Sequence, residues 1–130
     1  MARTRILVVD DEEEICSITK AFLEKKDYDV QSAYTSEGAL GLIHQERPQI
    51  VLLDIRLGEE SGLELLRKIK EFDKNIKVIM VTALDDQETI RQARALGADD
   101  YATKPFTANY LHEIILQKIS LLSAKQESKQ

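Results

Sequence analysis

The sequence of 130 residues predicts a single α/β domain built on a doubly wound, five-stranded parallel sheet with helices on both faces. Three runs of apolar, β-prone residues support this prediction: 6–9, 50–53 and 78–81. Runs without a polar break are typical of strands buried on both faces, as in the middle of a parallel sheet. Apolar residues at helical spacing follow each run, so strands alternate with helices and right-handed crossovers are expected.

The first half of the chain predicts three strands and two helices. Strand 6–9 ends in the acidic pair Asp10-Asp11, and the acids that follow suit a helix start, where the helix dipole favours negative charge. Residues 29–33 are less apolar, as an edge strand allows. The expected elements are a strand at 6–9, a helix to about Lys25, a strand at 29–33, a helix capped by Thr35 or Ser36, and a strand at 50–54.

The second half predicts two further strands and three helices. After Asp54, Gly58 and Gly62 bracket an expected flexible turn. Asp85 with Glu88 has the spacing of a capping box. The expected elements are a helix from Leu63 to Phe72, a strand at 76–81, a helix that Gly97 ends, a strand at 100–103 and a last helix to Leu122. We therefore expect a domain at 3–122, followed by a polar tail or the start of a linker at 123–130.

The composition excludes several classes of function. A net charge of −5 and a pI near 5.1 argue against binding nucleic acid, which depends on Lys and Arg neutralising phosphates. Cys16 is the only cysteine, so no intrachain disulfide is expected, and a reducing compartment is the natural location. No signal peptide or apolar stretch of membrane-spanning length is recognised. We expect a cytoplasmic protein that binds neither nucleic acid nor membrane.

Polar groups gather where the predicted strands end. The carboxyl ends of parallel strands meet at one edge of the sheet, so Asp10, Asp11, Asp54 and Thr82 are expected there, joined by Lys104. Each residue alone has a simpler explanation as a strand end, a cap or a surface lysine. Together, three carboxylates suit Mg²⁺, a lysine and a hydroxyl suit phosphoryl oxygens, and Asp54 is the most plausible nucleophile.

At these positions the sequence resembles the receiver domains of two-component response regulators, from about Arg3 to Leu122. The resemblance rests on Asp10-Asp11 after two valines, Asp54 in Leu-Leu-Asp-Ile-Arg-Leu, Gly62-Leu63, Thr82-Ala83, residues 97–101 and Lys104-Pro105-Phe106. It implies a flavodoxin-like fold with five helices and the strand order 2-1-3-4-5.

The resemblance also implies the roles of the residues that bind phosphate and metal. Asp54 would accept a phosphoryl group from a histidine kinase or a phosphotransfer protein. Asp10 and Asp11 would hold Mg²⁺, with Mn²⁺ as the alternative cation, and Asp54 and the backbone carbonyl of Arg56 would complete the ligands. Lys104 would pair with the acyl phosphate.

The switch and the lifetime of the phosphoryl group involve further residues. Thr82 and Tyr101 resemble the switch pair of the family, and the Lys104-Pro105 bond would be cis. A homodimer through the fourth helix, fifth strand and fifth helix is one arrangement open to the phosphorylated domain. Arg56 and Leu84 would overhang the face from which water attacks and tune the lifetime of the phosphoryl group.

The sequence departs from the family at Leu57-Gly58, where Met-Pro is usual, so a glycine replaces a proline that would stiffen the loop. Two alternatives are open: an Mg²⁺-dependent phosphohydrolase that forms an aspartyl phosphate, and a degenerate module that is not phosphorylated. Arg56 stands where such hydrolases carry a second acid, so we expect a switch that is not an enzyme beyond its own phosphorylation and dephosphorylation. The domain is either free-standing or part of a longer regulator.

Overall fold

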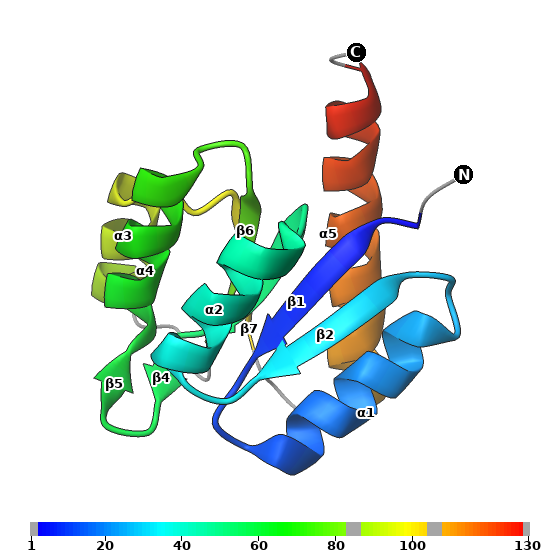
Figure 1. Ribbon diagram of the computed structural model, residues 1–130, viewed down its shortest axis with the longest axis horizontal. Coiled ribbons are helices and arrows are strands. Elements are labelled where there is room, and N and C mark those ends of the chain that lie inside the picture. Colours follow the sequence, from blue (N-terminus) through cyan, green and yellow to red (C-terminus); the bar gives the residue numbers. More distant parts are fainter. Residues whose placement is uncertain (1–2, 83–86, 104–107, 129–130) are drawn as a thin grey trace.

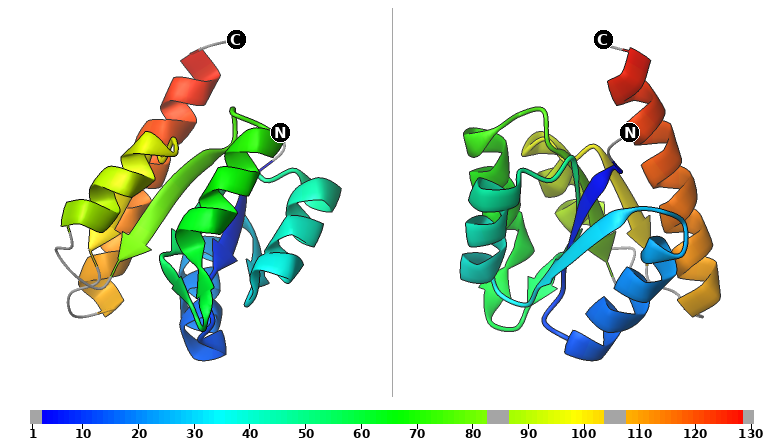
Figure 2. Two further views of the ribbon diagram at one scale, coloured as in Figure 1. Left: turned by 90° about the vertical axis from the view of Figure 1, so that its left-hand side faces the viewer. Right: turned by 45° about the vertical axis from the view of Figure 1, so that its right-hand side comes forward.

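The computed structural model describes residues 3–82, 87–103 and 108–128, with side chains except at Thr82, 108–111 and 123–128. Its centre is a twisted sheet covered by helices on both faces (Figures 1 and 2). In Figure 1, α2, α3 and α4 lie on one side of the sheet, and α1 and α5 lie on the other. The predicted three-layer α/β architecture is therefore confirmed.

The sheet has the order β2-β1-β3-β6-β7, and every neighbouring pair is parallel. Numbered within the sheet alone, this is the predicted flavodoxin-like order 2-1-3-4-5. The central strand β3 is buried at all five positions, as its unbroken apolar run predicts. The strands are β1 (Arg5–Val9), β2 (Asp29–Ala33), β3 (Ile50–Asp54), β6 (Lys77–Thr82) and β7 (Asp100–Thr103).

Five helices form within the described residues. The predicted cap of the second one is Thr35, whose Oγ1 accepts the N–H of Gly38 at 3.0 Å. Asp85, predicted to open the fourth helix, lies outside the described residues. The helices are α1 (Glu13–Glu24), α2 (Ser36–Glu46), α3 (Gly62–Phe72), α4 (Gln87–Ala95) and α5 (Ala108–Ser128). None of them, over the ranges that the structure describes, is long and apolar enough to span a membrane.

The last helix is longer than its apolar pattern suggested. α5 continues through residues 123–128, where the sequence predicts a polar tail, so that segment begins as a helical extension. The predicted domain boundary at residue 122 stays a prediction.

The loop after β3 is a short antiparallel hairpin, which differs from the expected flexible turn. Its strands are β4 (Arg56–Leu57) and β5 (Glu60–Ser61), joined by Gly58 and Glu59. Gly58 has a φ of +62°, and a positive φ at the first loop position alone is the pattern of a type II′ turn. Proline is locked near −65°, so it could not take this conformation. Glycine here selects a different turn, instead of loosening the one that proline would form.

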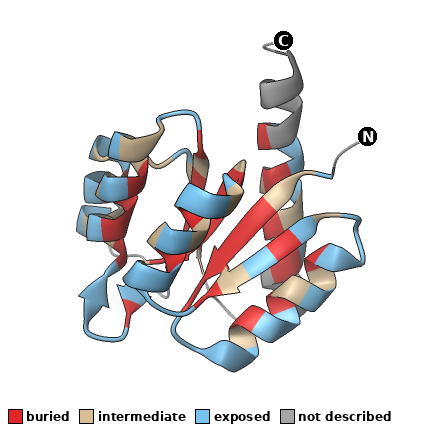
Figure 3. Cartoon of the chain, viewed as in Figure 1, coloured by how far each residue is buried: buried red, intermediate tan, exposed pale blue. Residues whose placement is uncertain are grey.

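The core consists of two apolar layers separated by the sheet. Figure 3 shows buried residues in the strands and in the helices that cover them. Alternate residues of each strand belong to opposite layers, as strand geometry requires. One layer packs the sheet against α2, α3 and α4 and contains Leu7, Val9, Leu53 and Met80. The other packs it against α1 and α5 and contains Ile6, Val8, Leu52 and Ile79.

Candidate functional site

Two buried carboxylates lie at the carboxyl edge of the sheet. Asp10 directly follows β1 and Asp54 ends β3, and only 4% and 7% of their respective surfaces are exposed. β1 and β3 are neighbours with Val9 opposite Leu53, so the two acids end adjacent strands in register. The structure thus brings together the two aspartates that the apolar runs predicted at this edge.

The backbone around Asp10 is fixed by several hydrogen bonds. Its N–H donates to the carbonyl of Ala33 on β2 at 3.1 Å, and its Oδ1 accepts the N–H of Glu12 at 3.0 Å. The Sγ of Cys16 lies 3.4 Å from the Asp10 carbonyl oxygen. Burial, together with the negative charge of Asp10, raises the pKa of the Cys16 thiol to about 11. Cys16 is therefore protonated at neutral pH and packs as a small apolar residue.

Asp11 and Glu12 extend the acidic group toward solvent. Their carboxylate oxygens and one of Asp10 all lie within 4.8 Å of one another, and both side chains are exposed. The hairpin also lies close to this group, since a Cβ added to Gly58 would lie 3.8 Å from Asp11 Oδ2. The sequence predicts only a helix start at Glu12, and the structure shows in addition that its carboxylate lies near those of both aspartates.

Asp54 is held in place by the loop that follows it. Its Oδ1 accepts the N–H of Arg56 at 3.0 Å, and the N–H of Ile55 donates to the Val81 carbonyl at 3.1 Å. These bonds fix both the orientation of the carboxylate and the path of the chain beyond it.

Gly62 completes this support through a close backbone approach. Its N–H donates to the Ile55 carbonyl at 2.7 Å, and a Cβ at this position would lie 2.2 Å from the Asp54 carbonyl oxygen. Real Cβ atoms do not approach so closely, so only glycine fits here without a backbone shift. The sequence indicated a turn at Gly62, but not that the residue packs against the chain at Asp54.

A cavity of about 20 Å³ lies beside the two aspartates, with room for about one water molecule. Both Asp10 and Asp54 line it, and so does Thr19 of α1, which sequence reasoning did not select. Thr19 in turn contacts the buried His112 of α5, with 3.3 Å between Oγ1 and Nε2. This long-range contact gives no local signal in the sequence.

The other predicted residues are placed as follows. Thr82 ends β6 opposite Thr103 of β7, and Arg56 is exposed on β4. Tyr101 lies on β7, partly buried, where it contacts Arg94 of α4. Leu84, Lys104 and Pro105, including the predicted cis bond, lie outside the described residues.

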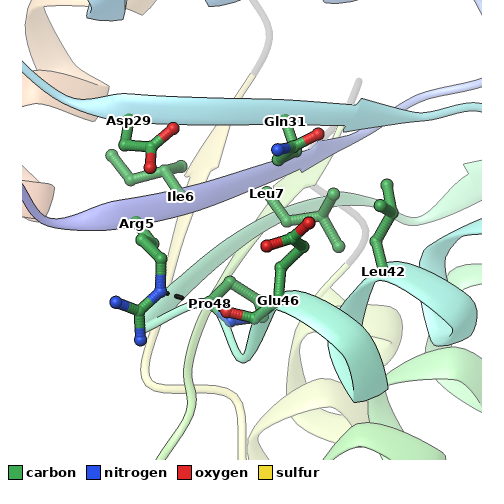
Figure 4. A pocket seen from close by; sticks show the side chains of 8 residues that line it. All are labelled: Arg5, Ile6, Leu7, Asp29, Gln31, Leu42, Glu46 and Pro48. Atoms are coloured by element: carbon green, nitrogen blue, oxygen red, sulfur yellow. Dashed lines mark hydrogen bonds between the residues drawn. The ribbon is translucent and has the colours of Figure 1, made fainter.

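A second cavity, of about 10 Å³, lies at the opposite, amino end of the sheet (Figure 4). Arg5 lines it, but its Nε donates to the carbonyl of Glu46 at 3.0 Å, and its Nη2 to that of Arg47 at the same distance. These bonds complete the C-terminus of α2, so Arg5 has a structural role there. The acidic edge is the better candidate for chemistry.

The acidic edge suits a hard divalent cation. Its donors are all carboxylate oxygens, the ligand type that Mg²⁺ prefers, and the two exposed acids leave the group open to solvent and substrate. The residues present therefore fit the metal that the resemblance implies. The grouped oxygens belong to Asp10, Asp11 and Glu12, whereas Asp54, which lines the same cavity as Asp10, is a ligand that the resemblance implies.

Comparisons with known proteins agree with this geometry. Residues 6–116 match the family described as response regulator receiver domain. A CheY-like receiver domain protein from Methanospirillum hungatei JF-1 is 35% identical, with a TM-score of 0.84 over 95% of this chain and 99% of that one.

Two structures of DrrB are also similar. DrrB of Thermotoga maritima, an OmpR/PhoB homologue, is 33% identical, with a TM-score of 0.83 over 96% of this chain and 54% of that one. The BeF3-activated DrrB receiver domain is also 33% identical, with a TM-score of 0.82 over 95% and 99% of the two chains. With its fold, its acidic edge and these matches, the chain belongs to the receiver domains of two-component response regulators.

Proposed function

We propose that this receiver domain is a phosphorelay switch in which Asp54 accepts a phosphoryl group from a histidine kinase or a phosphotransfer protein. The observation that carries the proposal is the placement of Asp54. It is buried at the sheet edge, its Oδ1 is oriented by the Arg56 N–H, and it shares a cavity with Asp10. An oriented carboxylate in a confined site is suited to act as a nucleophile.

The transfer is a displacement at phosphorus. A carboxylate oxygen of Asp54 attacks the phosphorus of the phosphohistidine, and a P–O bond forms as the N–P bond breaks. The ring nitrogen of the histidine leaves with the electron pair of that bond. Return to the resting state is hydrolysis, in which a water oxygen attacks the phosphorus and the carboxylate of Asp54 is released with inorganic phosphate.

The surrounding residues support this chemistry by charge. Bound Mg²⁺, or Mn²⁺ as the alternative, would neutralise phosphoryl oxygens. Asp10 and Asp11 would hold the cation together with Asp54 and the backbone carbonyl of Arg56. Lys104 would pair with the phosphoryl group, and the hydroxyl of Thr82 would donate a hydrogen bond to a phosphoryl oxygen.

The output of the switch is a surface change. Thr82 moves toward the phosphoryl group and Tyr101 turns inward, which alters the face formed by α4, β7 and α5 and exposes it to a partner, an attached effector or a second copy. Two discrete states biased by phosphate are sufficient for this. We place the domain in the cytoplasm, where histidine kinases deliver phosphate.

The test is phosphorylation by acetyl phosphate in the presence of Mg²⁺, followed by intact-mass measurement. The wild-type protein should gain one phosphate and the Asp54→Asn variant none. Asp29→Asn is a matched control, because Asp29 is exposed at the amino end of β2, and this variant should gain one phosphate as well. Phosphate that persists in Asp54→Asn would refute the assignment. Rapid turnover of a phosphomonoester such as p-nitrophenyl phosphate would instead identify a phosphohydrolase.

A further inference from the structure

Tyr101 is held against α4 by a single arginine. The Nη2 of Arg94 donates a hydrogen bond to the Tyr101 hydroxyl, and the guanidinium carbon lies 5.0 Å from the centroid of the tyrosine ring. The first contact engages the polar end of Tyr101, and the second is a cation–π interaction with its aromatic face. Arg94 therefore contacts both the hydroxyl and the aromatic ring of Tyr101.

These contacts draw Tyr101 away from the phosphorylation site. α4 returns the chain from the carboxyl end of β6 to the amino end of β7, so it runs antiparallel to the strands, and Arg94 is near its last residue. Asp54 lies at the carboxyl edge, at the opposite end of this helix. A ring that stays against Arg94 cannot at the same time turn toward that edge.

The pair also shapes the surface of the domain. Both residues line an open groove of about 480 Å³ together with Gln87, Ile90, Arg91 and Thr103. If the ring moves away from Arg94, it no longer lines the groove and no longer shields the guanidinium from solvent. A motion of Tyr101 is thus converted into a change of shape and charge on this face.

We propose that Arg94 is a positioning residue, an arginine latch that holds Tyr101 in the resting orientation and is broken when Asp54 is phosphorylated. The proposal rests on the proposed function, because the inward turn of Tyr101 is part of it. Contacts that form in only one of two states shift the equilibrium toward that state. Their removal favours the phosphorylated arrangement and, by linkage, strengthens the binding of any ligand that prefers it.

The expected size follows from the exposure of the pair. A cation–π contact at an exposed site and a net hydrogen bond each correspond to a factor of about two to five. Arg94 is exposed, so solvent weakens both contacts. We therefore expect the complete latch to shift the equilibrium by about five-fold.

The experiment measures the affinity for beryllofluoride, an acyl-phosphate mimic, with Mg²⁺ present, from amide resonances of the ¹⁵N-labelled domain. Arg94→Gln should bind about five-fold more tightly than wild type, and Arg94→Lys, which keeps the charge but not the planar fork, should lie between them. Arg91→Gln is the matched control. It removes the same charge from the same helix, from a residue ion-paired with Glu88, and should bind like wild type.

The outcomes separate the latch from the function on which it rests. Wild-type binding with unchanged affinity in Arg94→Gln would overturn the latch alone. A wild-type protein that does not bind beryllofluoride would overturn the proposed function, and the latch with it. In a Tyr101→Leu background, Arg94→Gln should have no effect. An undiminished gain there would show that Arg94 acts through another residue, which also refutes the latch.

Discussion

Two glycine-to-alanine substitutions in the same domain should change stability in opposite directions. At Gly62 a Cβ would lie 2.2 Å from the Asp54 carbonyl oxygen and 2.8 and 2.9 Å from the Cα and carbonyl oxygen of Ile55. All three are backbone atoms, which cannot rotate away as a side chain does. At Gly41, exposed within α2, nothing lies within 4 Å of the added Cβ.

The magnitudes follow from these contacts. Overpacking typically costs about 1–3 kcal/mol, and the rigid backbone places Gly62→Ala at the upper end of this range. The Gly62 N–H bond to Ile55 would be disturbed as well, at about 1 kcal/mol. We expect Gly62→Ala to lower the free energy of unfolding by about 3–4 kcal/mol. Gly41→Ala should raise it by about 0.5–1 kcal/mol, because alanine favours the helix.

The assay is urea and thermal unfolding followed by circular dichroism. At about 4 °C per kcal/mol for a domain of this size, Tm should fall by roughly 12 °C or more for Gly62→Ala. Gly41→Ala should raise Tm by about 2–4 °C. Below its Tm, Gly62→Ala should also accept phosphate from acetyl phosphate more slowly, since the displaced backbone carries Asp54. A Gly62→Ala protein within about 1 kcal/mol of wild type would refute the argument from close approach.

Three further predictions concern the hairpin, the pH dependence and the phosphoryl lifetime. Gly58→Pro should lower the free energy of unfolding measured in urea by more than about 1 kcal/mol, because Gly58 has a φ of +62° and proline cannot adopt it. A higher free energy of unfolding would show that the turn rearranges freely. Burial lowers the pKa of His112 below 6.5, so its contribution to stability is complete above pH 6.5 and is lost as pH falls through the folded pKa. In urea titrations at pH about 7.5, 6 and 5, the free energy of unfolding should therefore fall less with pH in His112→Phe than in wild type. Equal decreases in the two proteins would contradict this. Leu84→Ser and Arg56→Asn should each speed loss of the phosphoryl group by about ten-fold, measured as decay of phosphorylated protein after the donor is removed. This is less than the acceleration that a general base provides. Unchanged decay in both variants would show that neither side chain limits the access of water to the site.

The strands and the site aspartates were predictable because one physical constraint determines both. A central strand of a parallel sheet must be apolar on both faces, so 6–9, 50–53 and 78–81 are visible as unbroken runs. Where such a run stops at an acid, the acid must lie at the sheet edge. Asp10 and Asp54 could therefore be placed from the sequence alone.

Other features depend on contacts between distant segments, and no local pattern reports them. Gly62 must be glycine because of the backbone at Asp54, but in the sequence it has the appearance of any turn glycine. His112 meets Thr19 across the α1 and α5 interface, and their separation along the chain hides the pair. The extension of α5 beyond residue 122 lacks the apolar stripe on which helix prediction relies.

The two apolar layers have a consequence for how the domain can be altered. Asp10 and Asp54 line a cavity with Ile115 of the α1 and α5 layer, whereas Tyr101 packs against the layer of α2, α3 and α4. The hydrogen-bonded sheet separates these layers, so the apolar packing contributed by Ile115 and the apolar packing around Tyr101 belong to different halves of the core. Repacking at Ile119 should therefore change the first layer, and repacking at Ala93 should change the second. The two kinds of repacking should combine almost additively, because substitutions that share no partners rarely couple.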